Sequence, residues 1–133
     1  MNIQTVYTKK APEPIGPYSQ AVIAGDYVFI AGQIGIDPNT GKLVEGGIKE
    51  QTNQVIDNIE AILNSVGLKL KRVVKTEVYV TNLDEVRDLN EIYSARFVYD
   101  QKPARATVQV VKLPKDAKVE ISSVAYLGDK NVQ

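Results

Sequence analysis

The chain has 133 residues, enough to bury a core without disulfides or a structural metal, and we expect a single domain over residues 1–133. Its 16 basic and 16 acidic residues balance, so no overall field favours nucleic acid or anionic lipid as a partner. It contains no cysteine and no histidine, which excludes thiol nucleophiles, Ser-His-Asp triads, the usual zinc sites and imidazole acid/base catalysis.

The first half of the chain predicts three strands and a helix. A short strand over residues 3–7 precedes the proline-rich segment APEPIGPYSQA, which is typical of an extended loop. The runs SQAVIAG and DYVFIAGQIGI, which meet at Gly25-Asp26, predict a β-hairpin, and residues 37–42 predict a turn or loop after it. From Ile48 onward apolar residues recur at steps of three and four until Gly67, which predicts an amphipathic helix ended by that glycine.

The second half predicts a strand, a second helix and two further strands. Residues 73–81 alternate in character, as in a half-buried strand whose apolar face is Val74, Thr76, Val78 and Val80. Asn82 and Glu85 resemble a capping pair that opens a helix. Its apolar stripe contains one polar residue, Asn90. The last two strands, over residues 104–111 and 118–127, could form an antiparallel hairpin.

This order of elements, β-β-β-α-β-α-β-β, predicts an α+β fold with both helices on one face of a single sheet. An open face carrying Tyr79, Val124 and Tyr126 would suit a subunit interface, so we expect a homo-oligomer. No apolar run approaches the roughly 20 residues of a membrane span, and the stretch MNIQTVYTKK lacks the apolar core of a signal peptide. We therefore expect a cytoplasmic protein with no membrane partner.

Arg105 raises the main chemical question, because it lies near the start of an apolar strand. Its guanidinium keeps its charge and is costly to bury without an anion opposite. If the apolar faces of the last two strands meet the helices, Arg105, Thr107 and Glu120 share the uncovered face. Spacing alone favours a structural salt bridge between Arg105 and Glu120, since such pairs are common. Asn90 and Tyr18 likewise suit a core hydrogen bond and simple packing.

Six segments of the chain form a recognisable combination: IGPYSQA (15–21), AGQIG (31–35), VYVTNL (78–83), LNEIY (89–93), PARATV (103–108) and LPKDAKVEI (113–121). Together they resemble the reactive intermediate deaminase A (RidA) family, also called the YjgF/YER057c/UK114 family, over about residues 12–125. The resemblance implies a chorismate-mutase-like fold, a single mixed sheet with two helices, assembled as a homotrimer with active sites between neighbouring subunits. It also implies hydrolysis of 2-imino acids, such as 2-iminobutanoate and 2-iminopropanoate, to 2-keto acids and ammonia without a metal or cofactor.

The resemblance assigns two catalytic residues. The carboxylate-binding arginine of the family falls on Arg105, whose planar fork could hold a substrate carboxylate through two parallel hydrogen bonds. The glutamate of the family falls on Glu120, where it would orient or deprotonate the water that attacks the imine carbon.

The resemblance also assigns residues that build the pocket and bind substrate beside Arg105. Tyr18, Gly32 and Asn90 match the family's tyrosine, glycine and asparagine at these motifs. Thr107 stands where many relatives have cysteine, so oxidant activation through a thiol should be absent. Its backbone amide would remain available, and its hydroxyl could donate to substrate or water.

Two other functions remain open. Some family members have been described as endoribonucleases or translation inhibitors, yet the only basic cluster, at residues 69–75, is more simply a solvated turn. We therefore expect no nucleic-acid partner. Alternatively, the trimer could be a non-enzymatic module that binds small carboxylates, or a chaperone-like surface. In that module Arg105 would matter and Glu120 would not.

Overall fold

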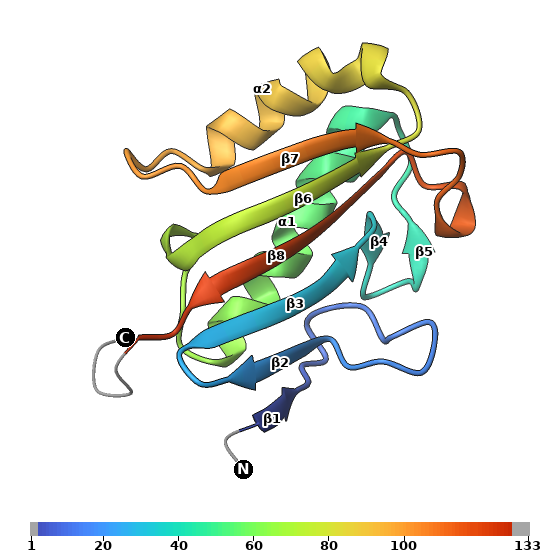
Figure 1. Ribbon diagram of the computed structural model, residues 1–133. Helices are drawn as coiled ribbons and strands as arrows, with labels where there is room; N and C mark the ends of the chain where they lie inside the picture. Colours follow the sequence, from blue (N-terminus) through green and yellow to red (C-terminus); the bar gives the residue numbers. More distant parts are fainter. Residues whose placement is uncertain (1–2, 129–133) are drawn as a thin grey trace.

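The computed structural model describes residues 3–128, in which one mixed sheet is covered on one face by two helices (Figure 1). The sheet has six strands in the order β1-β2-β3-β8-β6-β7, and a two-stranded ribbon, β4 (Ile36–Asp37) with β5 (Lys42–Leu43), extends from its end. The predicted α+β arrangement is confirmed. The sheet strands are β1 (Ile3–Val6), β2 (Ala21–Ala24), β3 (Tyr27–Gln33), β6 (Val73–Val80), β7 (Ala104–Gln109) and β8 (Val119–Tyr126).

Helix α1 (Ile48–Ser65) lies behind the sheet (Figure 1), and one side of it is buried there. Val55, Ile59, Ile62 and Leu63 are fully buried along the predicted stripe, and each such side chain contributes about 1.5–3 kcal/mol relative to an exposed one. The helix is followed by Gly67 at φ 79°, a left-handed conformation that glycine adopts without strain, so the predicted end is confirmed.

The predicted hairpin of the last two strands is wrong. β7 pairs only with β6, and it does so in parallel, whereas β8 lies between β3 and β6 and is antiparallel to both. The reason is the connection between β6 and β7, which is the helix α2 (Val86–Arg96). A helical crossover returns the chain to the end where the previous strand began, so the next strand runs parallel to it.

Helix α2 begins later than the capping pair predicts. Asn82 caps a short 3₁₀ turn over Leu83–Glu85, where its Oδ1 accepts a hydrogen bond of 3.0 Å from the amide of Asp84, and α2 follows at Val86. The helix then runs along the β6–β7 side of the sheet (Figure 1).

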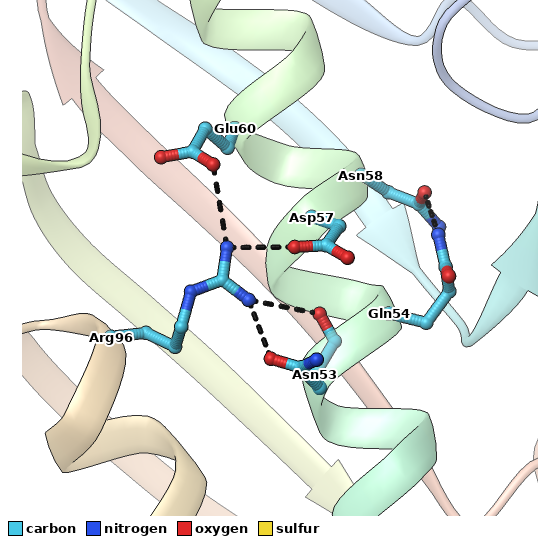
Figure 2. Close-up of polar contacts among 6 residues, drawn as sticks. All are labelled: Asn53, Gln54, Asp57, Asn58, Glu60 and Arg96. Carbon is cyan, nitrogen blue, oxygen red and sulfur yellow. Dashed lines mark hydrogen bonds and ion pairs between the residues drawn. The ribbon is translucent and has the colours of Figure 1, made fainter.

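Arg96, in the last turn of α2, ties this helix to α1 (Figure 2). Its Nη1 donates to Oδ1 of Asn53 at 2.6 Å, and its Nη2 lies 2.8 Å from a carboxylate oxygen of Asp57 and 3.4 Å from one of Glu60. One guanidinium therefore contacts three successive turns of α1.

The strand register corrects the prediction about which side chains share a face. Parallel pairing sets Arg105 beside Thr76 and Thr107 beside Val78, and Thr76 and Val78 are buried under the helices. Arg105 and Thr107 therefore face α2. Glu120 pairs with Tyr79 on the opposite, open face. Of the three residues predicted to share that face, only Glu120 therefore lies on it.

The prediction failed because β7 is an edge strand. Its small and apolar alternate residues, Ala104, Ala106 and Val108, lie on the open face and are exposed, so the apolar face of this strand does not meet the helices. A second, smaller error concerns β6: a bulge between Val73 and Lys75 buries Val73 in place of Val74.

The open face carries exposed aromatic and aliphatic side chains, which include Tyr27, Phe29, Val108 and Tyr126. The homo-oligomer predicted from this face stays a prediction. Neither helix of the described residues is both long and apolar enough to cross a membrane.

Candidate active site

A pocket at the end of β3 brings together three of the predicted site residues, Tyr18, Gly32 and Glu120. It encloses about 440 Å³ of empty space, part of which opens to solvent. Apolar side chains from three separate segments complete its walls; they include Ile15, Ile34, Ile36 and Pro114.

Gly32 and Glu120 lie so close that no side chain fits between them. A Cβ atom on Gly32 would stand 2.5 Å from Oε2 of Glu120, which is far inside van der Waals contact. The glycine thus lets the Glu120 carboxylate lie across β3. Burial raises the pKa of Glu120 above its ordinary value of 4.5. A carboxylate in such a position accepts a proton more readily than one in water.

The loop that carries Tyr18 is held by a buried glutamine. The Gln20 side chain is 2% exposed; its Nε2 donates to the carbonyl oxygens of Thr8 at 3.0 Å and Pro12 at 2.9 Å, and its Oε1 accepts from the amide of Thr8. Within the loop, the amide of Ile15 donates to the Tyr18 hydroxyl at 3.1 Å. The Tyr18 side of the pocket is therefore fixed from both ends of the loop.

Arg105 lies outside this pocket and has different surroundings. Its Nε donates to Oγ1 of Thr107 at 2.7 Å, and its guanidinium carbon lies 4.7 Å from the centre of the Tyr93 ring. Within residues 3–128 no carboxylate forms an ion pair with it. Burial lowers the pKa of the guanidinium from its usual high value. The salt bridge to Glu120 that spacing favours is therefore wrong.

One chain cannot bring Arg105 and Glu120 to the same small ligand. Glu120 belongs to the open-face row with Tyr79 and Val108, whereas Arg105 belongs to the helix-facing row with Thr76. The two rows are three residues apart, which is about 10 Å along the strands. Strands β8 and β7 lie on either side of β6, which adds about 10 Å across the sheet, and the two side chains point to opposite faces. The described residues thus form two separate groups. We call Arg105 with Thr107 the basic half-site, and Glu120 with Tyr18 and Gly32 the acidic half-site.

Asn90 sits nearer to the basic half-site. It is exposed on α2, one turn before Tyr93, and residues three apart on a helix lie on the same side. The interpretation of Asn90 as a buried core hydrogen bonder is wrong, and its side chain is open to a ligand.

The chain is similar over nearly its whole length to known proteins. The profile of the family described as Endoribonuclease L-PSP matches residues 8–127. A RutC family protein of Pyrococcus abyssi is 51% identical over 123 residues, which cover 92% of this chain and 96% of the relative. The chain belongs to this family.

Two further members of the L-PSP family carry more specific names. A human protein named 2-iminobutanoate/2-iminopropanoate deaminase is 43% identical over 125 residues, which cover 94% of this chain and 90% of the relative. The crystal structure of RidA from an Antarctic Psychrobacter matches with a TM-score of 0.89 at 48% identity, covering 92% of this chain and 98% of that one. The resemblance to RidA that the sequence motifs indicate is confirmed.

Sequence reasoning about this L-PSP family member missed two residues that shape the half-sites. Tyr93 counted only as part of an apolar stripe, although its place one turn after Asn90 is a usable signal. Gln20 gave no signal, because its three loop contacts depend on how the proline-rich segment folds back.

Proposed function

We propose that this protein hydrolyses short 2-imino acids, such as 2-iminobutanoate and 2-iminopropanoate, to 2-keto acids and ammonia. The observation that carries the proposal is Arg105, a half-buried guanidinium with no carboxylate partner within the described residues. A charge held in this way is suited to an external anion. The name of the human relative supplies the substrate class.

Arg105 would bind the carboxylate of the imino acid. Its Nη groups are free within the described residues, and two parallel hydrogen bonds from them match the two oxygens of a carboxylate. This contact fixes the imine carbon at a set distance from the guanidinium. The pocket walls formed by Ile34, Ile36 and Pro114 would accept the short apolar side chain of the substrate.

Glu120 would act on water. Its raised pKa suits a group that accepts a proton as water attacks the imine carbon and then returns that proton to the departing nitrogen. The carbon–oxygen bond forms first and gives a tetrahedral adduct with one hydroxyl and one amino group. The carbon–nitrogen bond then breaks as the proton of that hydroxyl also passes to the nitrogen, and the products are the keto acid and ammonia. Because an imine carbon is already electrophilic, this route needs neither a metal nor an organic cofactor.

The separation of the two half-sites requires a second chain in this proposal. Arg105, Thr107 and Asn90 of one subunit would meet Tyr18, Gly32 and Glu120 of its neighbour. A homotrimer repeats that contact three times, and the exposed open face of each sheet offers apolar surface for it. The functional unit would therefore be the oligomer.

The first test measures the reaction itself. A threonine dehydratase or an amino acid oxidase generates the imine, semicarbazide traps what remains free, and the protein should accelerate imine loss. Arg105→Ala should weaken transition-state binding by about 2–5 kcal/mol, as when one partner of a desolvated charge pair is removed, and kcat/KM should fall accordingly. No acceleration by the wild type, or full activity in Arg105→Ala, would refute the proposal.

The second test addresses the shared site. Arg105→Ala and Glu120→Gln chains should each have little activity in isolation, but unfolding and refolding a 1:1 mixture should restore about a quarter of wild-type activity. A quarter is expected because a site is intact only when one neighbour supplies Arg105 and the other supplies Glu120. If both residues acted within one chain, every mixture would stay inactive.

RNA cleavage is the second candidate, because the matching family is described as an endoribonuclease. A groove lined by Lys71, Arg72 and Tyr126 offers positive charge beside an aromatic ring. Cleavage of single-stranded RNA that falls steeply with salt and survives Arg105→Ala would favour this function over imine hydrolysis.

A further inference from the structure

Arg105 is held entirely by neutral groups within the described residues. The Tyr93 ring lies under the guanidinium at 4.7 Å, and Oγ1 of Thr107 accepts the Nε hydrogen at 2.7 Å. Arginines inside proteins are more often held by carboxylates, which neutralise them. An aromatic face attracts a cation without doing so. The charge of Arg105 therefore stays available.

The Tyr93 ring is itself held by two contacts, and the helix that carries it is fixed as well. Its hydroxyl shares a buried hydrogen bond of 2.8 Å with Oγ1 of Thr76, the residue beside Arg105 in the strand register. Its ring packs on Phe97 with ring centres 4.6 Å apart, and 7% of the residue is exposed. Three residues later, Arg96 fixes the end of α2 to α1 (Figure 2). The ring is thus a fixed surface.

The contacts also determine which nitrogens of Arg105 remain free. A guanidinium can hold a carboxylate either through Nε and one Nη or through its two Nη groups. Since Thr107 already occupies Nε, only the second arrangement stays open. The carboxylate must then approach along the end of the side chain.

We propose that Tyr93 is a positioning residue, whose ring, together with Thr107, orients Arg105 so that its two Nη groups bind the substrate carboxylate end-on. This inference rests on the proposed function, since it assumes that Arg105 binds a carboxylate. It adds a specific role for the residue at position 107: Thr107 serves Arg105 through its side chain and does not need to touch the substrate.

The test compares two substitutions at the same position with calorimetric binding of 2-ketobutyrate. Tyr93→Leu removes the aromatic face, and the dissociation constant should rise by about 3- to 30-fold, the range that a partly desolvated cation–π contact supplies. KM should rise with it, while kcat changes less. Tyr93→Phe keeps the face and loses only the bond to Thr76, so it should lower Tm yet weaken binding clearly less than Tyr93→Leu.

A matched control separates positioning from loss of stability. Ile62→Ala removes a fully buried side chain from α1, the helix that carries neither Tyr93 nor any predicted site residue, so it should lower Tm and leave the dissociation constant near the wild-type value. If Tyr93 acted only through stability, the order of the three variants by Tm would be the same as their order by binding affinity.

Thr107 provides an independent arm if Tyr93→Leu does not fold. Thr107→Val removes the acceptor for Nε and should weaken binding, whereas Thr107→Ser retains the hydroxyl and should bind more tightly than Thr107→Val. In NMR spectra, the Arg105 Nε–H signal, shielded by the Tyr93 ring, should move downfield in Tyr93→Leu and stay closer to its original position in Tyr93→Phe.

The outcomes distinguish the inference from the proposed function. If Arg105→Ala abolishes binding of 2-ketobutyrate but Tyr93→Leu and Thr107→Val bind as the wild type does, the positioning role is refuted and carboxylate binding by Arg105 stands. If Arg105→Ala also binds as the wild type does, the proposed function itself fails.

Discussion

Arg105 and Glu120 are both half-buried charged residues of one sheet, yet their surroundings differ. Arg105 rests on the Tyr93 ring and donates to Thr107, so its orientation is fixed while its charge is not neutralised. Glu120 lies against the backbone of Gly32, and burial alone accounts for the rise in its pKa.

Under the proposed function, this difference predicts that the basic half-site binds the substrate and the acidic half-site exchanges protons. A side chain that must hold a ligand in place benefits from rigid support, whereas one that exchanges protons benefits from surroundings that bring its charged and neutral forms closer in free energy. Substitutions should therefore act on binding at the basic half-site and on turnover at the acidic one.

The largest effect should come from Glu120→Gln, which breaks the acidic half-site alone. The amide cannot accept a proton from water, so kcat should fall by about 10²- to 10⁴-fold, while the dissociation constant for 2-ketobutyrate changes little. Stopped assays and calorimetry on the same preparation measure both quantities. A parallel loss of binding would show that the two half-sites do not divide the work.

Gly32→Ala should have the next largest effect. The added methyl group would displace the Glu120 carboxylate, and a shift of about 1 Å at a catalytic group costs up to about 100-fold in kcat. Ala31→Gly, on the preceding residue of β3, is the control for a general effect on the strand. Unchanged kcat in Gly32→Ala would mean that the position of Glu120 is not critical.

The acid limb of the pH profile should show a smaller, graded effect. Because burial raises the pKa of Glu120 above 4.5, kcat/KM should fall about tenfold per pH unit below a midpoint that lies above 4.5. The same shift makes the folded protein relatively more stable at low pH than at neutral pH. This part of the stability is fully present below the pKa of Glu120 in the unfolded chain and is lost as pH rises through its pKa in the folded chain. Glu120→Gln should therefore raise Tm slightly at pH 7 and remove this part of the pH dependence of stability.

Local patterns predicted the elements well and their pairing less well. The stripe of α1 extends over many turns, so its buried residues and its end at Gly67 follow from the sequence. The parallel pairing of β6 with β7 follows from the α2 crossover, a helix that the sequence does predict, whereas the insertion of β8 between β3 and β6 leaves no local signal. Alternation on β7 misled because an edge strand can expose its apolar residues.

The site residues were predicted from family motifs, and their grouping was not. Tyr18, Gly32 and Glu120 come from three distant segments that meet only when β3 lies beside β8. Spacing suggested a salt bridge between Arg105 and Glu120, because it carries no information about opposite faces of the sheet. The role of Tyr93 depends on the register that sets Thr76 beside Arg105.

The smallest effect should come from Arg96→Ala, which loosens α2 without touching either half-site. Arg96 is partly exposed and so are Asp57 and Glu60, so solvent screening limits its ion pairs, and the loss in unfolding free energy should be about 0.5–1 kcal/mol. Because α2 carries Tyr93, any loss of function should appear as weaker binding of 2-ketobutyrate, with kcat unchanged. Asp57→Asn keeps the shape of the contact and should show a smaller part of the same change. A drop in kcat with intact binding would connect α2 to the Glu120 pocket and contradict the division between the two regions.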